Sequence, residues 1–301
     1  MKRVLIQLLV FIFPVWASFA QTDQILHPEL PATTPSDIIL HHTGYTLRYD
    51  SSFHLARWVA YELTAEETVP IAERNNRFVP DPFLPSGSAS NADYDKSGYD
   101  KGHLAPSADM CYSSLTMQES FYLSNMSPQD PGFNRGIWKQ LEEQVRNWAV
   151  GEKKVYVVTG PVLSKGLASI GDNQITIPRY FYKVILDYTQ PVLKGIGFIM
   201  PNERSALPLK YFAVSIDSVE MVTGLDFFYQ LPDEQEKVIE SKADPDKWNW
   251  KTSRVKQKKT IQPSGNEKAT VVRCSAITKK GTRCLRTTSS PNGRCSQHGG
   301  K

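Results

Sequence analysis

The sequence lacks internal repeats and any apolar run long enough to span a bilayer comfortably. Its longest apolar stretch, residues 4–16, has only 13 residues, whereas a membrane-spanning helix needs about 20. With 40% hydrophobic and 11% aromatic residues, the composition excludes a disordered, collagen-like or coiled-coil chain. The 301 residues suffice for one large domain or two small ones. We expect a soluble protein with a sizeable core.

The first 20 residues have the three-part pattern of a secretory signal peptide. Lys2 and Arg3 give a positive start, residues 4–16 are almost wholly apolar, and Ser18 and Ala20 supply the small residues of a cleavage site. An uncleaved anchor or a buried first helix is the alternative. No cysteine follows the cleavage site, which argues against a lipid anchor. The pattern predicts a periplasmic or secreted protein.

Acidic side chains are almost absent from the end of the chain. Residues 247–301 carry 14 Lys or Arg and one acid, Glu267, for a formal charge of +13. Residues 21–246 carry 19 Lys or Arg and 30 acids, for a charge of −11. A strongly basic segment predicts a polyanionic partner. A solvated linker that only aids solubility is the alternative.

The apolar patterning predicts an α+β domain on a mixed or antiparallel sheet. A helix is expected from Asn134, at the N-cap position, to Gly151, and residues 80–100 form a long loop of the kind that often carries function. Strands are expected at residues 45–49, 56–63, 154–163, 180–188 and 194–200, with a weaker one at 206–216 and a helix-containing stretch at 217–231.

The composition changes along the chain predict its organisation. An irregular leader at residues 21–43 precedes the main domain at 44–232. A charged, basic linker follows at 233–270, and a small unit with cysteine and histidine closes the chain at 271–301.

An acid, a base and a histidine stand together at the end of the long loop, in Asp100-Lys101-Gly102-His103. Histidine accepts a proton near neutral pH, and hydrolysis of a phosphodiester needs a group that takes a proton from water. This spacing alone is a weak signal, because a loop histidine is more often a hydrogen-bonded surface residue.

A second group of residues is suited to bind a hard metal ion. Asn134 and Glu142 lie about two helical turns apart, so both can point towards the same side of the helix. Amide and carboxylate oxygens suit Mg²⁺, which keeps several waters and needs few protein ligands. Helix capping is the structural alternative for Asn134.

These motifs, in this order and spacing, resemble the DNA/RNA non-specific endonucleases, the endonuclease G-like ββα-metal nucleases. The family pattern is Asp-Arg-Gly-His, then Ser-Asn-x-x-Pro-Gln, then Asn-x-Gly with a downstream Trp and Leu-Glu. The matching segments here are residues 100–103, 124–129 and 134–142. The resemblance extends from about Gly44 to Leu231 and implies a ββα-metal (His-Me finger) core, in which a two-stranded ribbon carries the histidine.

The resemblance also implies a role for each matching residue. His103 would be the general base that activates water, and Asn134 would be the direct ligand of Mg²⁺ or Mn²⁺. Glu142 would hold metal-bound water. Asn125 would shape the site by hydrogen bonding, and Asp100 would orient the motif as a structural acid.

Basic side chains are the candidates for substrate contact. The family has an arginine near the phosphate, and Arg74 and Arg77 both match its surroundings, with Arg77 slightly favoured. Arg135 and Lys101 are further candidates. Lys101 stands where the family has arginine, so it keeps the charge but loses the planar two-pronged contact.

The closing unit has the residues of a zinc site. Cys274, Cys284, Cys295 and His298 supply three thiolates and one imidazole, a tetrahedral Zn²⁺ set. A disulfide is the alternative, since export leads to an oxidising compartment. Cys111, beside the catalytic motif, is expected to be a buried thiol.

The expected function is that of an exported metal-dependent endonuclease, acting on DNA and RNA without strong sequence preference. One alternative is a catalytically weak nucleic-acid-binding protein that relies on the basic tail, and another is a phosphodiesterase for small substrates. A homodimer and an inhibitor protein stay open as partners, and no membrane contact is expected after signal removal.

Overall fold

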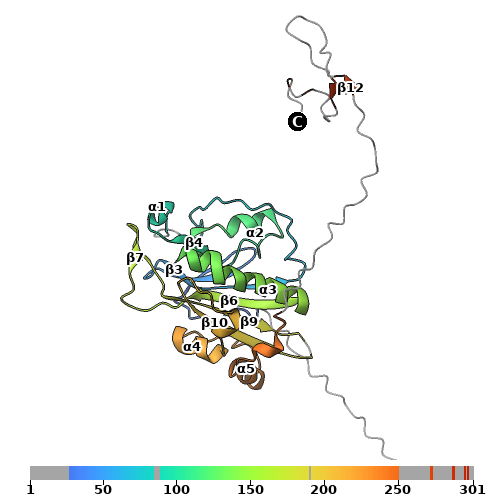
Figure 1. The fold of residues 1–301 in the computed structure, drawn as a ribbon. Helices are drawn as coiled ribbons and strands as arrows, with labels where there is room; N and C mark the ends of the chain where they lie inside the picture. The colour runs from blue at the N-terminus through green and yellow to red at the C-terminus, as the bar shows by residue number, and fades with distance from the viewer. Residues whose placement is uncertain are drawn as a thin grey trace, which may run out of the picture. The chain divides into compact units, whose positions relative to one another are not determined.

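The computed structural model describes residues 27–84, 89–189 and 191–250, together with residues 272–273, 287–288, 295 and 297. The chain divides into two units, residues 1–252 and 253–301 (Figure 1). The signal peptide predicted at residues 1–20 lies outside the described residues. Among the helices that are described, none is both long enough and apolar enough to cross a membrane.

A seven-stranded sheet forms the centre of the first unit, with strand order β1-β2-β3-β6-β9-β10-β11. Every neighbouring pair is antiparallel, so the second of the two predicted arrangements, mixed or antiparallel, is the one present. The strands are β1 (Ile38–His41), β2 (Thr46–Asp50), β3 (Leu55–Thr64), β6 (Lys154–Pro161), β9 (Tyr180–Asp187), β10 (Lys194–Pro201) and β11 (Ala213–Val214). Short pairs form from β7 (Ser169–Ile170) with β8 (Ile175–Thr176) and, in the second unit, from β12 (Val272–Arg273) with β13 (Thr287–Thr288).

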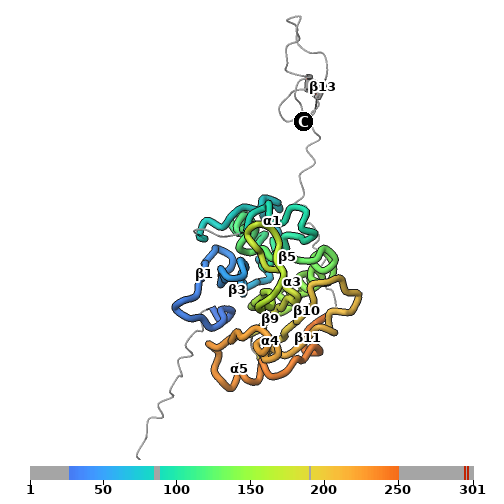
Figure 2. Tube along the Cα trace, turned by 90° about the vertical axis from the view of Figure 1, so that its left-hand side faces the viewer, coloured from blue at the N-terminus to red at the C-terminus, as the bar shows by residue number. Residues whose placement is uncertain are grey.

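Helices cover both faces of this sheet (Figures 1 and 2). The helix α3 (Lys139–Glu152) packs on one face, and α4 (Ile216–Thr223) and α5 (Asp233–Glu240) pack on the other. Side chains alternate along each strand, so in β9 Phe181 and Ile185 join the core under α3 while Val184 and Leu186 join the core under α4 and α5. The two cores explain why the central strands are apolar on both sides.

The predicted ribbon lies beside the sheet. It consists of β4 (Asp100–His103), paired antiparallel with β5 (Met126–Gln129). A Cβ atom at Gly102 would overlap the side chain of Gln129, so glycine permits the close approach of the two strands. The helices α1 (Asn91–Tyr94) and α2 (Ser114–Glu119) lie near β4 (Figure 1), and the 3-10 turn η1 (Leu123–Asn125) leads directly into β5.

The start and end of the main helix differ from the prediction. Asn134 is not an N-cap but lies inside η2 (Phe133–Trp138), a π-helical segment that leads into α3. Its side chain bonds Asp100 on the ribbon, a tertiary partner that local capping rules do not foresee. Gly151 lies within α3, and the chain leaves the helix at Lys153, whose φ is 73°.

The borders of the first unit are wider than predicted. The leader expected at residues 21–43 is wrong over β1, which pairs with β2 at the edge of the sheet. The linker expected at 233–270 is wrong over its first part, because Ile239 of α5 is buried against the sheet. Trp248, after the turn η4 (Pro245–Lys247), packs on Trp148 with ring centroids 4.6 Å apart. A few well-placed apolar side chains anchor a segment whose composition is mostly polar.

The strand expected at residues 206–216 is also largely wrong. Only β11 is extended there, after the 3-10 turn η3 (Leu209–Phe212), and α4 already begins at Ile216. Pro208 before the turn and Ser215 at the N-cap of α4, whose side chain accepts from the Ser218 amide, divide this segment into short elements.

Candidate active site

One pocket of about 310 Å³ opens between the ribbon and α3. It brings together most of the residues that the sequence predicted for the site. Its lining comprises Arg74, Lys101, His103, Pro106, Ser107, Ala108, Asn134, Arg135, Lys139, Glu142 and Arg146.

His103 is held by aromatic rings at the end of β4. Its imidazole meets Phe121 edge to face, with centroids 4.9 Å apart, and Phe78 at 5.8 Å. Burial, and then the positive charge of Arg74, lower the pKa of His103 to about 3. The ring is therefore neutral at neutral pH and able to accept a proton. Its Nε2 is shielded from solvent and has no hydrogen-bond partner among the described residues.

Asp100 orients the asparagine across the pocket. Its Oδ2 accepts a hydrogen bond from Nδ2 of Asn134 at 2.8 Å and another from Nε of Arg135 at 2.8 Å. Burial opposes ionisation of this carboxyl, but the bonds from Arg135 and Asn134 bring its pKa below the usual value. Because Asp100 occupies the amide nitrogen of Asn134, the amide oxygen is the atom left for a ligand.

Arg135 itself pairs with the same carboxylate at 2.5 Å, and its side chain is largely exposed. It lines the pocket, and its Nε and Nη2 both donate to Asp100.

Asn125 secures the chain that follows the histidine. It is fully buried, and its Oδ1 accepts from the Ala105 amide at 2.8 Å. Its Nδ2 donates to the carbonyls of Ala105 and Ser120 at 2.9 and 2.8 Å. These three bonds fix the backbone beside His103.

The two arginine candidates lie in different places. Arg74 lines the pocket, donates to Ser107 Oγ, and has its guanidinium 5.1 Å from the centre of the Phe121 ring. Arg77, which the sequence slightly favoured, is exposed and is not part of the pocket lining. The two differ by three positions along a segment without regular structure, so only the tertiary arrangement separates them.

Lys101 is held at the rim by aromatic faces. Its Nζ lies 5.3 Å from the ring centres of both Phe78 and Tyr94. Cation–π contacts of this kind hold a charged side chain in place without a carboxylate partner. Lys101 thus presents a positive point charge to the pocket in place of the planar fork of an arginine.

Glu142 lies in the pocket beside two positive charges, Arg146 and Lys183, whose proximity the sequence motifs did not indicate. Burial raises the pKa of Glu142 to about 7, while the positive charges of Lys183 and Arg146 act against this shift. Arg146 also binds Asp109 at 2.6 Å, and Asp109 accepts from the Tyr61 hydroxyl at 2.8 Å.

Lys183 of β9 is fully buried beneath the same site. Its Nζ lies 4.8 Å from the centre of the Trp138 ring and has no hydrogen-bond partner among the described residues. The sequence contains a signal for each of the two residues, Arg146 and Lys183. Arg146 is one turn after Glu142 on the same helix, and Lys183 interrupts an otherwise apolar strand.

The donor atoms fit a hard divalent ion. The free amide oxygen of Asn134 and the carboxylate of Glu142 line one pocket, and oxygen donors are those that Mg²⁺ and Mn²⁺ prefer.

The predicted zinc set lies almost wholly beyond what the structure describes. Cys274, Cys284 and His298 fall outside the described residues, and Cys295 is buried. The zinc site and its disulfide alternative therefore stay predictions. Cys111 is buried as expected and donates to the Ala108 carbonyl at 3.0 Å.

The comparisons with known proteins agree with the motifs and the fold. A family model described as "DNA/RNA non-specific endonuclease" matches residues 23–234. The mitochondrial nuclease EXOG of Mus musculus is 34% identical over 209 residues, 63% of this chain and 56% of its own length. A nuclease of Nostoc sp. (strain PCC 7120) is 34% identical over 223 residues, 70% of this chain and 80% of its own length. The chain thus spans little more than half of the mouse relative.

A solved structure shows the same architecture. The crystal structure of an EndoG/EndoGI complex, described as showing the mechanism of EndoG inhibition, superposes with a TM-score of 0.65 and 34% identity. The match covers 70% of this chain and 93% of that one. The predicted resemblance and the predicted α+β fold are both confirmed.

Proposed function

Because the chain belongs to the DNA/RNA non-specific endonuclease family, we propose that it is a metal-dependent endonuclease that hydrolyses phosphodiester bonds of DNA and RNA. The observation that carries the proposal is the pocket in which a neutral His103 stands with the oxygens of Asn134 and Glu142 and the positive charge of Arg74.

His103 is the general base of the proposed reaction. Since its Nε2 is shielded from solvent, Nδ1 is the ring nitrogen that takes the proton from the attacking water. The lowered pKa keeps this nitrogen free of a proton throughout the neutral range. Asn125 holds the backbone beside the ring, so the base keeps its orientation.

Asn134 would hold Mg²⁺ directly and Glu142 would hold it through water. When bound, the ion supplies charge stabilisation for the phosphate and the leaving oxygen. Asp100 keeps the Asn134 amide turned towards the pocket. Arg74 and Lys101 attract the phosphate and orient it, and Arg74 lies over the same Phe121 ring that His103 contacts.

The first test is cleavage by purified His103→Ala. The expected loss of plasmid and RNA cleavage is about 10²- to 10⁴-fold, because general acid–base catalysis is worth that much. His41→Ala is the matched control, since His41 is an exposed histidine of β1 outside the pocket. Undiminished cleavage by His103→Ala contradicts the assignment. Cleavage of a small chromogenic diester, with none of plasmid or RNA, favours the phosphodiesterase alternative.

The basic tail is proposed to supply sequence-independent attraction to nucleic acid. Trp248 and Trp250 pack into the first unit, so a clean truncation ends at Thr252 and not at Asp246. It removes 12 basic residues and one acid. Affinity for long DNA should fall and its salt dependence should flatten, by a slope of about 0.9 for each phosphate that the tail neutralises, with less effect on short substrates. If the truncated protein shows the same salt dependence of DNA affinity as the full chain, the tail does not take part in substrate binding.

Export and partners complete the proposal. The signal-peptide pattern of the first 20 residues supports a periplasmic or secreted enzyme, whereas the mitochondrial location in the names of several relatives belongs to those proteins. The likeness to the EndoG/EndoGI complex supports an inhibitor protein as a partner.

A further inference from the structure

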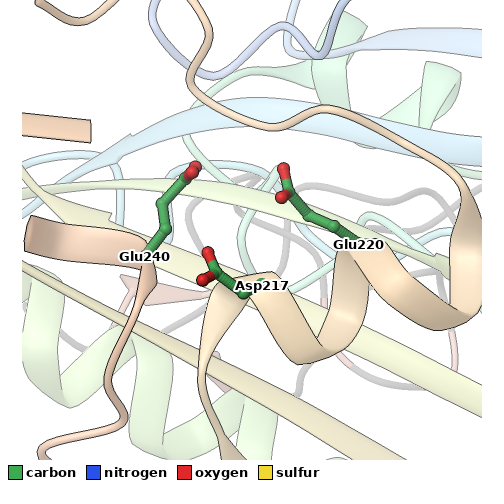
Figure 3. A group of neighbouring side chains, drawn as sticks. All are labelled: Asp217, Glu220 and Glu240. Carbon is green, nitrogen blue, oxygen red and sulfur yellow. The ribbon is translucent and has the colours of Figure 1, made fainter. Parts of the chain in front are cut away.

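Three carboxylates meet on the face of the sheet opposite α3. Asp217 and Glu220 stand one turn apart on α4, and Glu240 is the last residue of α5. One oxygen of each lies within 4.8 Å of the others. Figure 3 shows the three carboxyl groups turned towards a shared space between the two helices.

Glu240 is the member of this group that points to a ligand. Its side chain is buried, with the residue only 4% exposed, and its Oε1 has no hydrogen-bond partner in the described part of the chain. A buried carboxylate is costly unless a cation or hydrogen-bond donors compensate it. Here the neighbours that Figure 3 shows are two more carboxylates.

No positive side chain of the described residues forms an ion pair with these three neighbouring carboxylates. Within residues 27–84, 89–189 and 191–250, all twelve ion pairs involve other carboxylates. Burial, followed by the charges of Glu220, Glu236, Asp217 and Asp226, raises the pKa of Glu240 to about 9. Glu220 is only partly compensated, by the Phe227 amide that donates to it at 2.8 Å.

We propose that Asp217, Glu220 and Glu240 bind a calcium ion that joins α5 to α4. Three carboxylates make a hard, all-oxygen donor set, which suits Ca²⁺ or Mg²⁺ better than Zn²⁺, whose structural sites use cysteine and histidine. Ca²⁺ accepts six to eight oxygens in flexible geometry at about 2.3–2.6 Å, and three oxygens that all lie within 4.8 Å of one another are close enough to share one such ion. Mg²⁺ requires a tighter octahedron at about 2.0–2.1 Å. Asp217 is exposed, which leaves room for water to complete the coordination.

The site would secure the segment that follows the part of the chain matched by the family model. The family match ends at residue 234, so Asp217 and Glu220 lie inside it and Glu240 lies outside. The ion would therefore fasten the first segment beyond the family domain onto that domain. Cβ atoms at Gly195 and Gly197 would crowd Ile216 and Val219, which shows how closely α4 already packs on β10.

The test measures thermal stability of the full chain as calcium is added. All proteins carry Asn134→Ala, so that the catalytic ligand does not contribute to the response. Calcium at about 100 times its Kd should raise Tm by on the order of 5 °C. Adding Glu240→Gln should abolish this shift. Without calcium, Glu240→Gln should be about as stable as its parent, because a glutamine amide closely matches the protonated carboxyl that a pKa of about 9 keeps at neutral pH.

Glu234→Gln is the matched control, because Glu234 is an exposed acid on the same helix. It should keep the full calcium shift. An equal shift in the Glu240→Gln protein would overturn the proposal. So would the absence of any shift up to about 10 mM calcium, above the range in which extracellular calcium modules bind. If Glu240→Gln then raises Tm regardless of calcium, a shared proton and not a metal ion holds the cluster.

Discussion

The two faces of the central sheet bury acidic groups in contrasting surroundings. On the α3 face, Asp109 accepts from Arg146 at 2.6 Å, and Glu142 feels the positive charges of Lys183 and Arg146. On the opposite face, Asp217, Glu220 and Glu240 gather without an ion pair among the described residues. The first unit has a net negative charge overall, yet cations concentrate where the chemistry is proposed. On the pocket side, side chains of the protein itself compensate the buried negative charges. On the other face, a cation from solution would have to compensate the three carboxylates.

The largest expected effect on stability comes from removing the buried ion pair between Arg146 and Asp109 on the α3 face. Arg146→Met leaves Asp109 buried without its positive partner, with only the Tyr61 hydroxyl still donating to it, so the free energy of unfolding should fall by about 3–5 kcal/mol. Lys139→Met on the same helix breaks only the exposed pair with Glu143 and should cost about 0–1 kcal/mol. Guanidinium denaturation measures both. If both variants lost a similar amount of unfolding free energy, the buried Arg146–Asp109 pair would not stabilise this face more than the exposed Lys139–Glu143 pair does.

A smaller effect should follow from Lys183→Met, and it should appear in the pH profile of kcat/KM. The ammonium of Lys183 favours the charged form of Glu142, so its removal raises the pKa of Glu142 above about 7. If Glu142 must be ionised to hold metal-bound water, the acid limb moves to higher pH. At pH 7 the rate falls roughly tenfold for each unit of that movement and recovers in more alkaline solution.

Titration of His103 does not overlap with the acid limb of the kcat/KM profile, because its pKa of about 3 lies far below the pKa of Glu142. Lys154→Met is the control, since Lys154 is a partly exposed lysine of the neighbouring strand β6 that pairs with Glu62. It should leave the profile in place. An acid limb that stays at the same pH in Lys183→Met would show that Lys183 does not act through Glu142.

Much of the site could be predicted because its motifs are local. The ribbon, the histidine on it and the buried Cys111 lie where the sequence predicted them. The prediction failed where a long-range contact decides. Asn134 bonds Asp100 across the pocket in place of capping its helix, and Arg74 enters the pocket while Arg77 stays outside.

The errors at the borders have a related cause. Residues 233–250 have a mostly polar composition, so they resemble a linker. Ile239 and Trp248 are nevertheless enough to attach that segment to the first unit, because each buries a large apolar side chain in an existing core. Composition averages over a segment, whereas burial depends on where a few side chains fall.

The sequence by itself determined which chemical groups this protein carries and their order along the chain, and these were sufficient to indicate the family and the fold. Only the tertiary structure decided which of those groups share a space. Arg74, His103 and Glu142 come from distant segments yet meet in one pocket, while Glu240 meets Asp217 and Glu220 on the other face. The physical reason is that charge interactions and desolvation depend on distance and burial in space, and separation along the chain specifies neither.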